Sequence, residues 1–214
     1  AERVATVGNC VVTAVAPDTA LLPDEPTLDA GEITASVDAE DITLTLQETP
    51  DGPRYRSSAA EGRIEFFEAG SSLAVRSAGG PDVPAFTASL SAPAEPVVTS
   101  PEWELLGDAH PRSDDLTVAW SGAATEADVF VSVLPVRLFP DPGIAAGNAV
   151  TCTVPDTGSM GIPAEALAYL PEAGFGSQSV ALTVIRSVSE DVGLPGGAVV
   201  LNATTSHTII GAID

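Results

Sequence analysis

The sequence predicts an all-β protein, a single antiparallel β-sandwich of the Ig-like or jelly-roll-like, Greek-key kind, with one short helix near residues 163–170. Short segments of alternating apolar and polar residues recur along the chain with Gly and Pro turns between them. Hydrophobic residues make up 44% of the chain but aromatic residues only 5%, so Val, Ala, Leu and Ile must build the core, and this composition favours strands. Cys10 and Cys152 stand in opposite halves of the chain, where a disulfide would join them.

The N-terminal half begins with an extended segment over residues 3–15, which Gly8-Asn9 interrupts as a bulge or as a break between two strands. A proline-stiffened loop follows it. The clearest alternation comes next, with Ile42, Leu44 and Leu46 on one face of a strand, and residues 32–37 are its expected hairpin partner. Turns are expected at 38–41, 49–53 and 79–81, and further strands at 54–58, 63–67, 73–76 and 86–90.

Residues 92–96 carry two prolines and are either a domain linker or an ordinary connection. Each half of the chain has only a handful of strands, and a Cys10–Cys152 bridge would tie the first strand to the second half. We therefore predict one sandwich domain over residues 1–214. Its N-terminal strand, 3–15, is either tied by the disulfide or donated to a neighbouring molecule. Residues 100–115 then form a long crossover.

The C-terminal half continues the strand pattern around one helical segment. Pro163 stands in the first turn of the predicted helix and Pro171 stops it. Residues 208–213 are apolar and form either a last strand or a docked tail. The other strands are expected at 116–120, 129–133, 149–154, 180–184 and 199–205, with turns at 190–191 and 194–197.

Charge excludes two classes of partner. The chain has 30 acidic and 8 basic residues, all of the latter Arg, and a net charge of -22. Nucleic acids and anionic membranes both require basic surface, so neither is an expected partner. No apolar run approaches the roughly 20 residues of a membrane helix. The acidity reflects solubility in a salty medium, binding of a divalent cation, or attraction to a basic partner, and the even spread of the acids favours the first.

The two cysteines indicate an oxidising compartment. Their spacing fits neither a redox CxxC pair nor a zinc site, so a Cys10–Cys152 disulfide is the simplest interpretation, with two buried thiols as the alternative. The chain begins Ala1-Glu2-Arg3 without a charged and then apolar leader, so we expect a mature form after signal-peptide removal, or a sequence trimmed to that point. We therefore expect an extracellular or cell-surface protein.

Four segments carry structural motifs: Pro84–Leu90, Asp115–Trp120, Thr151-Cys152-Thr153 and Gly161–Pro171. These motifs resemble those of a group of uncharacterised exported proteins and lipoproteins from high-GC, myxobacteria-like bacteria. The resemblance covers about the last two thirds of the chain and implies export and an all-β fold, without an activity to carry over. The chain departs from the group in lacking a lipobox.

No catalytic constellation is evident in the sequence, and we predict that the protein is not an enzyme. His110 lies in a Pro-rich loop and His207 among Ser and Thr in a strand, and neither has a nucleophile-elbow partner, so both are expected to be exposed. Gly158-Ser159-Met160-Gly161 lacks the spacing of a nucleophile elbow. A hydrolase that uses two distant carboxylates is the remote alternative. Trp120 alternates with Val118 and Leu116 and is expected in the core rather than as a sugar platform.

Loop carboxylates are the candidates for a metal site, because Ca²⁺ takes six to eight oxygen ligands. None of the acidic loops matches an EF-hand or a nonapeptide calcium repeat, so solvated loops are the simpler interpretation and no other cofactor is expected. The candidate metal ligands are Asp38, Glu40, Asp41, Asp108, Asp114 and Asp115.

Two functional hypotheses follow. The first is a secreted, non-enzymatic structural or interaction protein, such as a surface, adhesive or fibre subunit, that associates with itself or with another extracellular protein through β-strand edges. The second is a calcium- or carbohydrate-binding β-sandwich module.

Overall fold

A computed structural model describes residues 2–16, 27–38, 40–49, 52–56, 67–103, 108–122, 127–138, 142–172 and 179–214. Strands dominate these residues and pair antiparallel in three sheets, so the all-β prediction is confirmed. A single sandwich is not confirmed. The chain divides into two compact units: unit 1 comprises Ala1–Leu22, Glu95–Ser187 and Thr205–Asp214, and unit 2 comprises Pro23–Ala94 and Val188–Thr204. The prolines of residues 92–96 therefore stand where the chain passes from one unit to the other, and the single-domain prediction stays a prediction.

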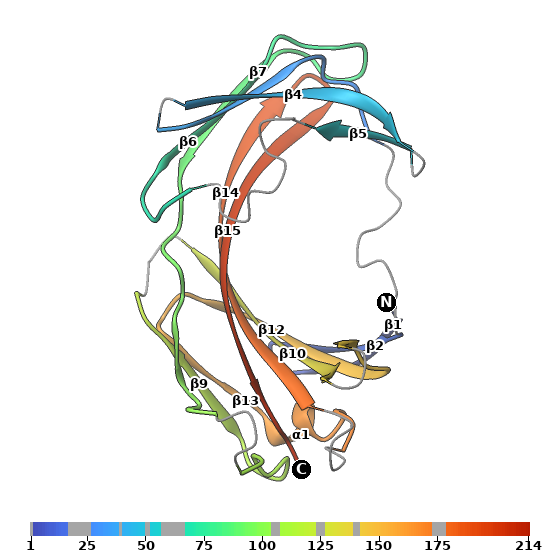
Figure 1. Ribbon diagram of the computed structural model, residues 1–214, viewed down its shortest axis with the longest axis vertical. Helices are drawn as coiled ribbons and strands as arrows, with labels where there is room; N and C mark the ends of the chain where they lie inside the picture. Colours follow the sequence, from blue (N-terminus) through green and yellow to red (C-terminus); the bar gives the residue numbers. More distant parts are fainter. Residues whose placement is uncertain are drawn as a thin grey trace. The chain divides into compact units, whose positions relative to one another are not determined.

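Unit 1 is built on a seven-stranded and a three-stranded sheet (Figure 1). The hairpin of β14 and β15 in the larger sheet continues into unit 2 over Val188–Thr204. The larger sheet has the order β1-β2-β12-β10-β14-β15, with β11 also paired to β10, and the smaller has the order β13-β9-β8. The strands of the larger sheet are β1 (Glu2–Val7), β2 (Cys10–Val15), β10 (Asp128–Arg137), β11 (Gly143–Ile144), β12 (Gly147–Pro155), β14 (Ser179–Leu194) and β15 (Gly197–Gly211). Those of the smaller sheet are β8 (Val98–Ser100), β9 (Leu116–Trp120) and β13 (Ser159–Ile162).

The core of unit 1 lies between these two sheets and the single helix of the described residues, α1 (Ala164–Leu167). Alternate residues of β10, among them Val129, Val131 and Val133, are buried on one face of the large sheet. Leu116, Val118 and Trp120 of β9 are buried with them, so the core position predicted for Trp120 is confirmed. Burial of each such aliphatic side chain contributes about 1.5–3 kcal/mol to stability.

The predicted disulfide is confirmed and lies inside the large sheet. Cys10 of β2 and Cys152 of β12 stand directly opposite each other in the register, with an S–S bond of 2.04 Å, and both residues are fully buried. The break at Gly8-Asn9 is a turn, since β1 and β2 form a hairpin within the chain's own sheet. Pairing of β2 with β12 therefore brings the beginning of the chain onto the strand that holds the second cysteine.

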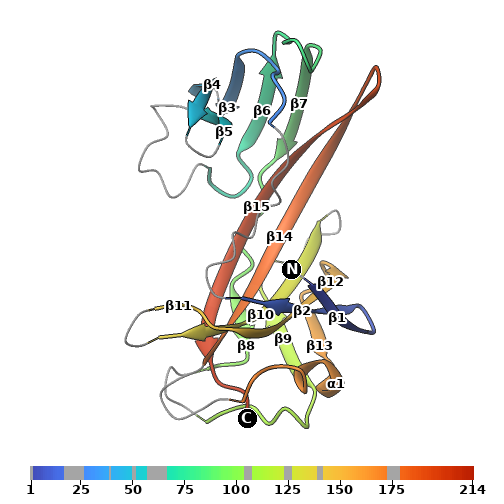
Figure 2. The ribbon, with the colours of Figure 1, turned by 90° about the vertical axis from the view of Figure 1, so that its right-hand side faces the viewer.

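Unit 2 is built on a five-stranded antiparallel sheet of order β5-β4-β3-β6-β7 (Figure 2). Its strands are β3 (Ile33–Val37), β4 (Glu40–Thr49), β5 (Gly52–Arg56), β6 (Ser72–Ser77) and β7 (Phe86–Ser91). The hairpin of β3 with β4 and the strands at 73–76 and 86–90 are confirmed. The strand expected at 63–67 falls largely on residues outside the described ones, and Phe67 itself lies beyond the end of any strand.

The C-terminal hairpin departs from its sequence prediction. The sequence predicts a turn at Glu190-Asp191, but β14 continues through both residues to Leu194. Glu190 and Asp191 are exposed, so neither charge is buried by continuing the strand. The turn predicted at 194–197 is confirmed at Pro195-Gly196, where Gly196 takes a positive φ of 91°. After it, β15 is one long strand to Gly211 in place of the two elements expected at 199–205 and 208–213.

Candidate functional site

The five-stranded sheet of unit 2 has one apolar and one hydroxyl-rich face. The register places Ala35 of β3 opposite Ile42 of β4 and Val75 of β6, and in turn Val75 opposite Ala88 of β7. Neighbouring residues of each strand point to the opposite face. That second face carries Thr34, Ser36, Thr43, Thr45, Ser72, Arg76, Thr87, Ser89 and Ser91.

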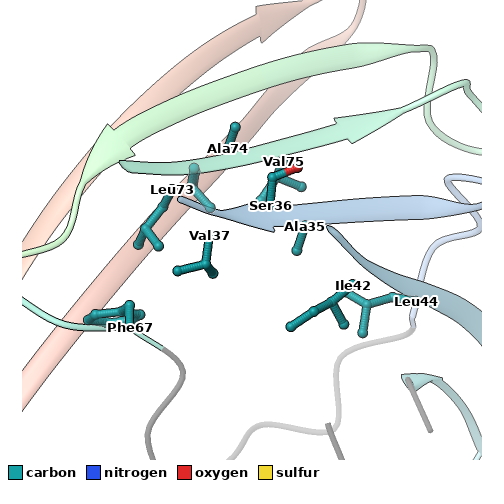
Figure 3. A pocket seen from close by; sticks show the side chains of 10 residues that line it. Ala35, Ser36, Val37, Ile42, Leu44, Phe67, Leu73, Ala74 and Val75 are labelled. Atoms are coloured by element: carbon teal, nitrogen blue, oxygen red, sulfur yellow. The ribbon is translucent and has the colours of Figure 1, made fainter. Parts of the chain in front are cut away.

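The apolar face contains a pocket of about 210 Å³. Figure 3 shows Val37, Ile42 and Leu73 pointing toward a common space from three neighbouring strands, with Phe67 across from them. The side chain of Ala74 points to the other side of the sheet. Leu201 of β15, from the part of the hairpin that belongs to unit 2, completes the lining together with Ala35, Ser36, Leu44 and Val75.

The lining determines what this pocket accepts. Among the residues that the structure describes, its surface is contributed by apolar atoms, and these offer no hydrogen bond that would orient a polar ligand and no group for general acid–base chemistry. Its volume suits one apolar group, since a cavity of about 150 Å³ lined by similar residues holds a benzene molecule. The pocket therefore has the size and lining to hold a single aliphatic or aromatic group.

The two edges of this sheet differ in chemistry. Strand β5 carries Pro53, Arg54 and Arg56, and proline and charge at an edge both oppose pairing with another chain. Strand β7, with the sequence FTASLS, has neither a proline nor a charged residue. It pairs with β6 through six consecutive residue pairs from Ser72↔Ser91 to Ser77↔Phe86 without a bulge. The β7 edge therefore lacks the features that usually protect an exposed strand.

Three of the six predicted metal ligands, Asp38, Glu40 and Asp41, lie in unit 2. The Asp38 carboxylate accepts a hydrogen bond of 2.8 Å from the Ser72 backbone N–H. Hydrogen bonds from the Ser71 hydroxyl and from Ser72 lower the pKa of Asp38. Asp41 pairs with Arg76 at 2.7 Å and also accepts from the Ser36 hydroxyl. Glu40, the third, is exposed at the start of β4.

The other three candidates lie in unit 1. Asp115 accepts a hydrogen bond of 2.8 Å from the backbone N–H of Ala164 and so caps the first residue of α1. Asp114 accepts from the hydroxyl of Ser113 at 3.0 Å, and Asp108 is exposed. Within the described residues, no three His, Cys, Asp or Glu side chains come together in a way that would hold a metal ion.

Both histidines are partly buried rather than exposed, which corrects the sequence expectation. His207 lies on β15, and its Nδ1 accepts from the Val98 backbone N–H at 3.3 Å. His110 forms an isolated bridge with Ile213, and its Nε2 lies 3.1 Å from the Asp114 carbonyl oxygen. These contacts are to backbone groups. Ser159, the residue considered for a nucleophile elbow, belongs to strand β13, which pairs with β9.

Sequence reasoning did not single out a buried ion pair in unit 1. Arg186 of β14 donates from Nε to Asp156 Oδ2 at 2.6 Å, and the two side chains are 1% and 0% exposed. The Trp120 indole N–H donates to the other carboxylate oxygen at 2.7 Å, and Arg186 Nη2 donates to the Ser121 carbonyl oxygen at 3.0 Å. These hydrogen bonds satisfy both charges inside the core, which is the condition for burying them.

A comparison with protein-family models finds no match, and a comparison with curated proteins finds none either. Among the described residues no helix has the length and apolarity that crossing a membrane demands. The disulfide is consistent with an extracellular location.

Proposed function

We propose that this protein is a secreted, non-enzymatic structural or interaction subunit, of a cell surface, adhesive layer or fibre, that assembles through the edges of its β-sheets. The observation that carries the proposal is the open edge at β7. An edge strand presents unpaired backbone N–H and C=O groups, and a second strand that pairs with them gains affinity without requiring special side chains. An uncharged, regular strand in a chain with a net charge of -22 suits this use.

The buried disulfide supports the secreted part of the proposal. Such a bond persists in oxidising compartments and is rare in the cytosol. The high acidity suits the same setting, because ions of an extracellular medium screen repulsion between carboxylates over about 8 Å at physiological ionic strength. The net negative charge also keeps single molecules apart until an uncharged surface brings them together.

Size-exclusion chromatography with light scattering tests the proposal on the oxidised protein. The protein concentration is raised stepwise at low and high salt, with calcium or with EDTA. We expect oligomers that grow with concentration and are insensitive to calcium. A protein that stays monomeric under all these conditions contradicts assembly with itself. Oligomers that form only with calcium would favour the calcium-binding alternative.

A further inference from the structure

The outer side of β7 is available for pairing in the described part of the chain. The sheet order ends at β7, and the strand has β6 as its one ladder partner. The side chains of Thr87, Ser89 and Ser91 are exposed on the hydroxyl-rich face. Ala203 belongs to the same hydrophobic cluster of unit 2 as Leu73 and Ala92, and Leu90 packs against this cluster. The cluster therefore includes residues of the apolar face, away from those three side chains.

The hydrogen-bond pattern determines which backbone groups of β7 point outward. Ala92 donates to the Ser71 carbonyl oxygen at 2.8 Å and accepts from the Gly70 N–H at 2.9 Å, so its backbone faces β6. Backbone direction alternates along an antiparallel strand, and residues at even spacing from Ala92 share its direction. The N–H and C=O groups of Thr87, Ser89 and Ser91 therefore point away from β6.

The outward-facing backbone groups of these three residues can pair with the same groups of a second copy of the strand. We propose that β7 pairs antiparallel with β7 of a second copy, about a two-fold axis at Ser89. This register, which rests on the proposed assembly through strand edges, sets Ser89 opposite its own copy and Thr87 opposite Ser91. It pairs all three outward-facing residues, with two hydrogen bonds in each pair. A shift by one residue in either strand would place outward-facing backbone groups opposite inward-facing ones and the hydroxyl-rich face of one sheet beside the apolar face of the other. A shift by two residues would leave one outward-facing residue unpaired.

The side chains agree with the same two-fold pairing. On the hydroxyl-rich face only Thr and Ser meet across the axis. On the other face Ala88 stands opposite Leu90 of the copy, so a small residue meets a larger one at both ends. The two sheets then join into one sheet whose apolar faces are continuous. This isologous arrangement needs one surface patch only, as two-fold interfaces do.

Charge favours a second copy at this edge over the opposite edge of the same sheet, where β5 carries Arg54 and Arg56. The chain has no charged residue from Val83 to Ala94, a long uncharged run for a protein with a net charge of -22. Two identical chains repel through their carboxylates, and this repulsion is weakest where both contribute an uncharged strand. Association through β7 is therefore expected to strengthen as salt screens the rest of the surface.

Cross-linking tests the register directly. In the proposed pair the Cα atoms of Ser89 and its copy are about 5.5 Å apart, which is within the range that a disulfide spans. We expect Ser89→Cys to form a covalent dimer under mild oxidation. Thr43→Cys, at an exposed position on the same face but on the inner strand β4, is the matched control and should remain monomeric. Mass spectrometry of the intact protein checks that the Cys10–Cys152 bond is retained.

Ser89→Pro tests whether backbone hydrogen bonds of β7 contribute to the self-association. The Ser89 N–H points away from β6, so proline removes no hydrogen bond of the folded chain, and circular dichroism should confirm an unchanged fold. We expect its self-association, measured by analytical ultracentrifugation at high salt, to weaken at least tenfold, while Thr43→Lys changes it less than twofold. If the protein associates but Ser89→Cys cross-links no faster than Thr43→Cys, the β7 pairing is wrong and assembly through another edge stands. If no variant and no condition gives association, both proposals fail.

Discussion

Removal of the buried Arg186 charge should destabilise unit 1 by about 3–5 kcal/mol. Arg186→Met preserves most of the side-chain volume but leaves the Asp156 carboxylate in the core without its cation. Truncating one partner of a buried pair typically costs this much, because the remaining charge is desolvated and unpaired. Asp156→Asn retains an acceptor for the Trp120 indole and should cost a similar amount, because Arg186 is then the unpaired charge.

The double variant Arg186→Met/Asp156→Asn separates pairing from packing. With both charges absent, the destabilisation should fall well below the sum of the two single changes, by about 3 kcal/mol or more. Urea unfolding followed by tryptophan fluorescence measures this in unit 1, since Trp103 and Trp120 are the two tryptophans of the chain and both belong to that unit.

The exposed pair of unit 2 provides the control. Arg76 Nη2 lies 2.7 Å from Asp41 Oδ2, a distance close to that of the buried pair, but the two side chains are 59% and 51% exposed. Arg76→Met should therefore change stability by less than about 1 kcal/mol, as measured by circular dichroism. The reasoning is refuted if Arg186→Met costs no more than Arg76→Met, or if the double variant costs the sum of the two single variants.

Three further predictions concern other parts of the chain. Replacement of Cys10 and Cys152 by Ser opens a loop of 142 residues and should lower stability by up to about 5 kcal/mol in urea unfolding; an unchanged midpoint would show that the bond contributes nothing. Gly80→Ala should lower the melting temperature through a loss of about 1–3 kcal/mol, because the new Cβ would lie 2.5 Å from the Asp29 carbonyl oxygen; Gly143→Ala, where no atom lies within 4 Å, should not. Since folding lowers the pKa of Asp38, its carboxylate stabilises unit 2 above about pH 4, and this contribution is lost as the pH falls below that value. The difference in stability between wild type and Asp38→Asn should therefore shrink on acidification, and a difference that is constant from pH 7 to pH 3 would contradict it.

Alternation of apolar residues predicted most strands because one face of each strand is buried. Ile42, Ala88 and Val131 all lie on the buried side that the alternation assigns to them. The same logic failed at Glu190-Asp191, where adjacent acids were interpreted as a turn. A solvated stretch of strand accepts charge on both sides, so charge alone does not distinguish it from a loop. Strand β13 was missed because its four residues are too few to show a period.

The buried ion pair could have been predicted from the same alternation. Val180, Leu182 and Val184 are buried on β14, and Arg186 is the next residue in phase with them. Asp156 likewise follows Val150, Cys152 and Val154 in phase just beyond β12. A charge at a core position requires a partner of opposite sign. By contrast, the contacts of Asp38 with Ser72 and of Asp115 with Ala164 join segments that are distant in the sequence, and no local pattern encodes them.

The buried pair also bears on how β14 is registered in the large sheet. Strand β14 pairs with β10 from Asp128↔Ser187 to Val136↔Ser179, and Ala181 and Ser187 on its second face are buried as well. Because both faces carry buried residues, the contrast between a buried and a solvated face, which fixes the register of other strands, is smaller at β14. A slip by one residue would turn Arg186 to the other face and leave the Asp156 carboxylate without its cation, at a cost of several kcal/mol. The Arg186–Asp156 ion pair therefore favours the observed register over the slipped one, even where two apolar residues would pack equally well in both. On this argument the double variant should recover stability but show additional conformers of β14, visible as split amide resonances of residues 179–187, and a single set of resonances would show that packing alone sets the register.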